Sequence, residues 1–126
     1  MALKKITDRN RVSKPKSDSQ PDKPKPQILY VEDENTNWEI ASLSLSDRYQ
    51  VKRAKNSQEA FDLIESHKFE VILMDIQLMG SDLNGIEITQ ILKGLTTNAA
   101  LTYTLGVKAE TTPIIFVTAY SARYTK

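Results

Sequence analysis

The pattern of apolar and polar residues divides the chain from residue 27 onward into alternating strands and helices. Residues 28–31, 71–74 and 114–117 are short, continuous apolar runs, and residues 49–54 have the alternating character of a half-buried strand. Short apolar runs bounded by prolines, turn residues or charges are typical of strands, and a run without alternation is typical of a strand buried on both faces.

The segments between these runs carry apolar residues at helical spacing, and two of them begin with residue pairs that favour a helix start. In Thr36 with Glu39 and in Asn56 with Glu59, a short polar side chain stands three residues before a glutamate, as in a capping box. We therefore predict a helix after each of the first three strands, with Gly94 near the end of the third helix. The apolar residues at helical spacing are Trp38, Ala41 and Leu45, then Ala60, Phe61 and Ile64, then Ile88, Ile91, Leu92 and Leu95.

This alternation of strand and helix predicts the α/β class. Strands that are apolar on both faces and separated by amphipathic helices favour a parallel sheet covered on both sides. Right-handed crossovers then give a doubly wound sheet, whose functional site lies beyond the carboxyl ends of the strands. Residues 96–112 show no clear period and are predicted to form a long loop before the last strand.

The first 26 residues differ in composition from the rest of the chain. They contain four prolines and several serines, and they have almost no large apolar residue after Val12. Eight lysines and arginines against three aspartates give residues 1–26 a charge of +5, whereas nine basic and thirteen acidic residues give residues 27–126 a charge of −4. We predict a disordered, solvated basic tail before a domain at residues 27–126. A basic tail can contact nucleic acid or membranes, but neither partner is expected here.

Composition excludes several kinds of chemistry. The chain has no cysteine and one histidine, His67, which excludes disulfides and thiol catalysis and disfavours a zinc site. No apolar run is long enough to span a membrane, and charges interrupt the N-terminal segment where a secretory signal would be apolar. A cytoplasmic location is the simplest expectation.

Acidic residues follow the predicted strands at the ends where a functional site is expected. Glu32 and Asp33 follow the first strand directly, Asp75 ends the third, and the hydroxyl residue Thr118 ends the fourth. If the first and third strands are neighbours, three carboxylates meet and repel one another. A hard divalent cation relieves such repulsion, and a set of oxygen ligands suits Mg²⁺.

Three segments of the chain resemble the response-regulator receiver domain, a family with a flavodoxin-like, CheY-like fold. Residues 28–34 (ILYVEDE) are similar to its first strand and acidic pair, and residues 71–78 (VILMDIQL) with Gly85 are similar to its phosphoacceptor strand and loop. Residues 113–119 (PIIFVTA) resemble its fourth strand and switch hydroxyl. The resemblance covers about residues 27–126.

The resemblance implies a role for each residue of the acidic edge. Asp75 would accept a phosphoryl group from a sensor histidine kinase or a phosphotransfer protein, and the modified domain would signal to a downstream protein. Asp33, Asp75 and the backbone carbonyl of Gln77 would bind Mg²⁺, with Glu32 acting through a water molecule. Thr118 and the backbone of Ala119 would bind the phosphoryl group. Such a domain is a switch and not a stand-alone enzyme.

The chain also departs from the family pattern. Met79 stands near the usual position of a proline, the loop that follows Asp75 is about two residues longer than usual, and the connection before the fourth strand is also longer. A complete receiver has a fifth strand with a phosphate-binding lysine and two more helices, and Lys126 comes too early to be that lysine. We therefore expect an incomplete domain whose fourth strand is an exposed edge, either a fragment or a chain completed by a partner or a second copy.

Two other functions are compatible with the sequence. A pseudo-receiver would keep the fold for protein contacts without phosphorylation, and the missing lysine favours it if the truncation is natural. A phosphohydrolase with an aspartyl nucleophile usually has a second acid two residues after the nucleophile. Gln77 occupies that place, which opposes a phosphohydrolase.

Overall fold

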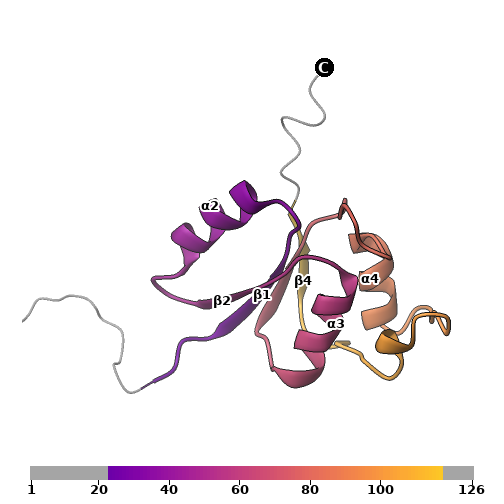
Figure 1. Ribbon diagram of the computed structural model, residues 1–126. Helices are drawn as coiled ribbons and strands as arrows, with labels where there is room; N and C mark the ends of the chain where they lie inside the picture. The colour runs from indigo at the N-terminus through magenta and orange to yellow at the C-terminus, as the bar shows by residue number, and fades with distance from the viewer. Residues whose placement is uncertain (1–22, 118–126) are drawn as a thin grey trace, which may run out of the picture.

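The computed structural model describes residues 23–117, and they form a parallel sheet between helices (Figure 1). The predicted tail lies almost wholly outside the described residues. At its end, the backbone carbonyl of Pro26 accepts a hydrogen bond from the Gln50 amide at 2.9 Å. The elements are β1 (Gln27–Val31), α2 (Asn35–Leu45), β2 (Gln50–Ala54), α3 (Ser57–Ser66), β3 (Val71–Met74), α4 (Gly85–Leu92), the 3-10 helix η2 (Thr102–Thr104) and β4 (Ile114–Phe116).

The four strands follow the order β2-β1-β3-β4, and every pairing is parallel. In the register, Val31 lies beside Ala54 on one side and beside Met74 on the other. The carboxyl ends of β1, β2 and β3 are therefore level with one another. This order confirms the predicted doubly wound α/β fold, with β1 and β3 as neighbours in the sheet.

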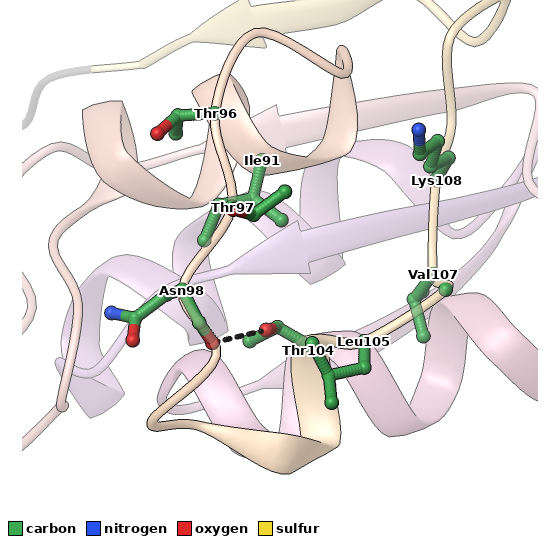
Figure 2. Close-up of a pocket in the computed structure, with 9 residues that line it drawn as sticks. Ile91, Thr96, Thr97, Asn98, Thr104, Leu105, Val107 and Lys108 are labelled. Carbon is green, nitrogen blue, oxygen red and sulfur yellow. Dashed lines mark hydrogen bonds between the residues drawn. The ribbon is translucent and has the colours of Figure 1, made fainter.

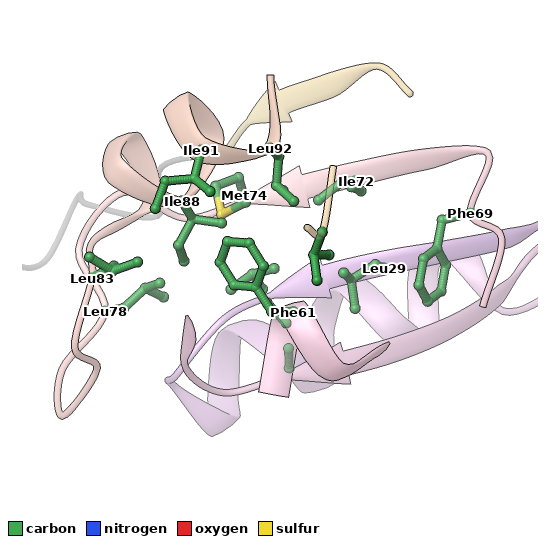
Figure 3. Close-up of a cluster of buried hydrophobic side chains, with 14 residues drawn as sticks. Leu29, Phe61, Phe69, Ile72, Met74, Leu78, Leu83, Ile88, Ile91 and Leu92 are labelled. Carbon is green, nitrogen blue, oxygen red and sulfur yellow. The ribbon is translucent and has the colours of Figure 1, made fainter. Parts of the chain in front are cut away.

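The hydrophobic core lies between the sheet and the pair α3 and α4 (Figure 3). Alternate residues of β1 and β3 point to this face, and Phe61 of α3 is fully buried among them. Burial of one large side chain of this kind contributes about 1.5–3 kcal/mol. The large side chains that are fully or almost fully buried on this face are Leu29, Val31, Phe61, Ile72, Met74, Ile88 and Leu92.

The opposite face of the sheet carries α2 (Figure 1). The rings of Tyr30 in β1 and Trp38 in α2 lie 6.4 Å apart, and Arg53 lies 5.8 Å from the centre of the Trp38 ring. No residue of α2 itself is fully buried, and Leu43 is 78% exposed. The predicted inner stripe of this helix is therefore only half-buried.

The helix starts agree with the sequence in part. Asn56 caps α3, because its side chain accepts a hydrogen bond from the Glu59 amide, as predicted. The predicted cap at Thr36 is wrong. Helix α2 starts earlier, with Glu34 at the N-cap position and no side-chain cap, and the Glu34 amide donates to the Glu32 carboxylate. The side chain of Asn84 forms a capping box at the start of α4, which sequence reasoning did not find.

Helix α4 ends earlier than its apolar spacing predicted. Gly94 has a φ of +79°, a left-handed conformation that favours glycine and ends the helix. Leu95 therefore lies beyond the helix and is 75% exposed, so its predicted place in the inner stripe is wrong. The following residues, 96–112, form a long connection as predicted, interrupted by η2.

The side chain of Lys93 joins the end of α4 to the chain that enters β4. Its ammonium group donates hydrogen bonds to the backbone carbonyls of Ala109, Glu110 and Thr112 at 3.0, 3.2 and 2.6 Å. A single charged donor thus satisfies three acceptors in a segment without regular structure. Hydrogen bonds to charged groups stabilise a fold more than neutral ones do.

Replacing Lys93 with methionine is expected to lower the free energy of unfolding by about 2 kcal/mol. The three carbonyls lose their charged donor, and hydrogen bonds from water compensate for this loss only in part. Methionine keeps most of the apolar length of the side chain. Urea denaturation followed by circular dichroism measures the change, and Lys68→Met, at an exposed position, is the control. Equal midpoints for the two variants would show that the three hydrogen bonds are not stabilising.

Strand β4 forms one edge of the sheet in residues 23–117. Ile115 is 53% exposed and Phe116 is 43% exposed, as expected for the apolar edge that the sequence predicted. No fifth strand occurs within this part of the chain. None of its helices combines the length and the hydropathy needed to cross a lipid bilayer.

Candidate metal and phosphoacceptor site

The three predicted acids meet at the carboxyl edge of the sheet. Glu32 and Asp33 follow β1, and Asp75 follows β3, which is its neighbour. One carboxylate oxygen from each residue lies within 4.8 Å of the others. Glu32 and Asp75 are buried and Asp33 is half-buried. The convergence predicted from the strand ends is therefore present.

The buried carboxylate of Glu32 is held by its neighbours. Its Oε1 accepts a hydrogen bond from the Tyr30 hydroxyl at 3.0 Å, and its Oε2 accepts one from the Glu34 amide at 3.0 Å. The side chain of Asn37 lies at 3.5 Å from the same Oε2. Both oxygens of the Glu32 carboxylate therefore already accept hydrogen bonds.

Of the two carboxylate oxygens of Asp33, one accepts a hydrogen bond and the other has no partner in the described residues. Its Oδ2 accepts a hydrogen bond from the Met79 amide at 3.1 Å, so it is tied to the loop that follows β3. Its Oδ1 is buried and has no hydrogen-bond partner within residues 23–117. A buried carboxylate oxygen without a partner is costly unless an ion or water satisfies it. The donor set therefore fits a hard cation with oxygen ligands, such as Mg²⁺.

Asp75 is positioned by the backbone on both sides. Its amide donates to the Val31 carbonyl at 3.1 Å, which continues the pairing of β3 with β1. Its own carbonyl lies against Gly85, at the start of α4, so closely that a side chain on the glycine would overlap it. Gln77 lies in the following loop with its side chain exposed. The predicted phosphate-binding residues Thr118 and Ala119 lie outside the described residues.

Sequence reasoning did not identify two residues at this edge, Tyr30 and Arg53. Tyr30 donates to Glu32 from the same face of β1, and burial, with the nearby Glu32 carboxylate, raises the pKa of its phenol well above the ordinary value. The hydroxyl therefore remains a donor at neutral pH. Arg53 donates from Nε to the Glu32 carbonyl at 2.9 Å and from Nη1 to Asn35 at 2.9 Å.

Both missed residues had a signal in the sequence. Tyr30 precedes Glu32 by two positions, so the two residues share a face of the strand. Arg53 lies near the carboxyl end of a strand that neighbours β1. The rule that functional residues lie at the carboxyl ends of the strands, which located the acids, therefore also applies to Arg53. Its guanidinium contacts the backbone just beyond the end of β1, at Glu32.

The sequence profile of the response regulator receiver domain family matches residues 28–126. The chain belongs to this family. The receiver domain is a signalling domain of two-component systems, and the match includes every acid of the cluster described above.

Curated relatives agree with this assignment. The receiver is 37% identical over 67 residues to the polar-differentiation response regulator DivK of Brucella anthropi, a match that covers 52% of the chain and 53% of DivK. It is 31% identical over 101 residues to the response regulator ArlR of Staphylococcus aureus, covering 79% of the chain and 39% of ArlR. The receiver thus spans about half or less of the length of these relatives.

Solved structures show the same fold. The non-phosphorylated HemR receiver domain from Leptospira biflexa superposes with a TM-score of 0.58 at 29% identity, covering 75% of this chain and 65% of that one. The response regulator TrrA, solved in complex with the histidine kinase ThkA, gives a TM-score of 0.59 at 24% identity, covering 80% and 75% of the two chains. These likenesses confirm the CheY-like architecture.

Proposed function

We propose that this receiver domain accepts a phosphoryl group on Asp75 from a phosphohistidine of a sensor histidine kinase or a phosphotransfer protein. The observation that carries the proposal is the convergence of Glu32, Asp33 and Asp75, with oxygens within 4.8 Å of one another at the carboxyl edge of the sheet. Three carboxylates in this space repel one another unless a cation joins them. The absence of cysteine is compatible with a reducing cytoplasm, where we propose that the domain acts.

Asp33 and Asp75 would hold Mg²⁺ through carboxylate oxygens, with the Gln77 carbonyl as a further ligand and Glu32 acting through a water. The free Oδ1 of Asp33 supports this assignment. When bound, the ion supplies positive charge that balances the negative charge on the oxygens of a transferring phosphoryl group. Arg53 adds a fixed positive charge beside the same edge.

In the proposed transfer, a carboxylate oxygen of Asp75 forms a bond to phosphorus while the bond between phosphorus and the donor imidazole nitrogen breaks. The electron pair of the broken bond returns to the imidazole ring. The backbone fixes Asp75 through the hydrogen bond to Val31 and the close contact with Gly85, so the nucleophile needs little reorientation. Thr118 and the Ala119 backbone are proposed to bind the phosphoryl group, and a downstream protein then recognises the changed surface.

A small-molecule phosphodonor tests the proposal directly. Incubation of the full 126-residue chain with acetyl phosphate and Mg²⁺ is expected to add the mass of one phosphoryl group, seen by intact-mass spectrometry. The addition should disappear when EDTA removes the cation. An unmodified chain under conditions in which it binds Mg²⁺ would favour a pseudo-receiver, whose partners recognise the fold alone.

Replacing Asp33 with asparagine should have opposite effects on stability with and without the cation. Without Mg²⁺, the variant is expected to be about 1 kcal/mol more stable than the wild type, because one of three crowded charges is removed. Its affinity for Mg²⁺ should fall at least about tenfold, as for loss of a partner of a metal site. Urea denaturation at several Mg²⁺ concentrations measures both effects.

The asparagine keeps an oxygen that can accept the hydrogen bond from the Met79 amide, so the loop after β3 should stay in place. Asp47→Asn, at an exposed position after α2, is a control for the loss of one negative charge. Equal stabilisation of the wild type and Asp33→Asn by Mg²⁺ would exclude Asp33 as a ligand.

A further inference from the structure

The loop between β3 and α4, residues 76–84, sets the position of one acid of the cluster. The Met79 amide of this loop donates to Asp33 Oδ2 at 3.1 Å. Any movement of the loop therefore moves this donor or breaks the bond. What holds the loop thus also determines how well the Asp33 carboxylate is oriented toward Asp75.

The loop is docked on the start of α3. The Ser57 amide donates to the Ser81 hydroxyl at 2.8 Å, and that hydroxyl donates to the Leu83 carbonyl at 2.7 Å. Ser57 is fully buried, and its hydrogen bond to Ser81 is partly buried. One side of the loop is therefore fixed to a helix that packs in the core.

Tyr103, from the long connection before β4, reaches the same place. Its hydroxyl donates to Asp82 Oδ2 at 3.0 Å and lies 2.7 Å from the Ser57 hydroxyl. A tyrosine hydroxyl has a single hydrogen, which goes to the Asp82 carboxylate, so Ser57 donates to the Tyr103 oxygen. The result is a chain of hydrogen bonds from Ser57 through Tyr103 to Asp82, in which each bond strengthens the next.

Tyr103 is itself held independently of the loop. Its ring packs 5.8 Å from that of Phe61 in the core, and it lies in η2. The adjacent Thr104 is buried. Its hydroxyl donates to the Leu101 carbonyl at 2.8 Å, and the Asn98 carbonyl lies 3.3 Å from the same hydroxyl. Figure 2 shows the contact with Asn98 beside a cavity of about 40 Å³. Tyr103 therefore lies on a turn that is held by contacts other than those with the loop 76–84.

Asp82 lies in the loop after Asp75, Tyr103 lies in the connection before β4, and Ser57 lies at the start of α3. We propose that Tyr103 is a positioning residue of the cation site. It holds Asp82 and Ser57 together, this contact fixes loop 76–84, and the fixed loop presents the Met79 amide to Asp33. This inference rests on the cation site proposed above.

The contact of Tyr103 with the loop and the binding of a cation at Asp33 should strengthen each other. A loop released from Tyr103 leaves Asp33 less well oriented, so the affinity for a divalent cation falls. Because coupling free energies are reciprocal, a cation that fixes Asp33 also strengthens the contact between the loop and the connection before β4. A molecule that binds this connection and breaks the contact of Tyr103 with Asp82 would therefore lower the cation affinity at a site that it does not touch.

Tyr103→Phe tests the proposal, since it removes the hydroxyl and keeps the ring that packs against Phe61. Isothermal titration calorimetry with Mg²⁺ on the full chain is expected to show an affinity about 3- to 10-fold weaker than that of the wild type, somewhat less than the loss for a direct partner of a metal ligand. Asp82→Ala, at an exposed position, should give a similar loss, and the double variant should lose little more.

A second measurement separates positioning from general destabilisation. Without metal, hydrogen exchange should be faster at residues 79–84 in Tyr103→Phe, with exchange in β1 and β3 unchanged. Asp82→Asn keeps an acceptor for the Tyr103 hydroxyl and should restore most of the affinity lost in Asp82→Ala. Tyr49→Phe, just before β2 at the other end of the sheet, should behave as the wild type.

The outcomes distinguish the two proposals. A wild-type chain that binds no Mg²⁺ would overturn the proposed cation site and this inference with it. A wild-type chain that binds Mg²⁺ with the same affinity as Tyr103→Phe and Asp82→Ala would overturn the inference alone. Equal losses in Asp82→Asn and Asp82→Ala would also overturn it, because the Tyr103 contact would then not be the cause.

Discussion

Asp75→Asn is expected to abolish phosphoryl uptake from acetyl phosphate completely. The substitution keeps the size of the side chain and removes the charged oxygen that attacks phosphorus, since an amide is a very weak nucleophile at neutral pH. It also removes one of the three negative charges that meet within 4.8 Å. Intact-mass spectrometry after incubation with Mg²⁺ and acetyl phosphate measures the loss. The phosphorylated fraction of the variant should fall below the limit of detection.

Two control measurements distinguish the loss of the phosphoacceptor in Asp75→Asn from a loss of folding. The variant should unfold at a urea concentration no lower than that of the wild type, because asparagine relieves repulsion between the carboxylates. Asp47→Asn changes the same kind of residue at an exposed position after α2 and should still be phosphorylated. A phosphorylated Asp75→Asn chain would place the acceptor elsewhere and would refute the proposed role of Asp75.

Gly85→Ala should have the largest effect on stability, about 3 kcal/mol or more, as for overpacking against atoms that cannot move. A methyl group at this position would overlap the carbonyl oxygen of Asp75 and lie 2.9 Å from both its carbonyl carbon and the Met74 side chain. The obstacle is mainly backbone at the carboxyl end of β3. The substitution should therefore displace Asp75 as well as destabilise the fold.

A second glycine provides the comparison. Gly106 has a φ of +77° and open space around it, so Gly106→Ala should cost only about 1 kcal/mol, from backbone strain. Urea denaturation compares the two variants, and titration with Mg²⁺ shows whether the cation site survives in each. A Gly85→Ala chain as stable as Gly106→Ala would mean that the contact with Asp75 is easily relieved.

The fold and the acidic cluster were predictable because they depend on rules that relate strand order to position. Continuous apolar runs predicted buried parallel strands, and the carboxyl ends of such strands lie at one edge. With the assumption that the first and third strands are neighbours, that rule predicted that Asp33 and Asp75 lie close together, although they stand 42 positions apart in the sequence. No side-chain geometry was needed for this step.

The parts that could not be predicted depend on tertiary contacts of single side chains. Thr36 has the local pattern of a helix cap, yet α2 begins before it, with the N-cap at Glu34, whose amide makes a hydrogen bond to the Glu32 carboxylate. Tyr103 lies in a segment without period, so nothing in the sequence indicated that its hydroxyl reaches Asp82. The spacing of Leu95 matched a helix that Gly94 ends.

Resistance to local opening differs between the two faces of the sheet, because α3 and α4 enclose the core while α2 buries no residue fully. An element with few buried apolar contacts opens transiently at a lower free energy than the strands do. Asp75 follows the buried strand β3, whereas Glu32 accepts hydrogen bonds from Glu34 and Asn37, at the start of the helix that buries no residue fully. We therefore expect hydrogen exchange to be faster at the amides of α2 beside Glu32 than at the amides of β3 beside Asp75.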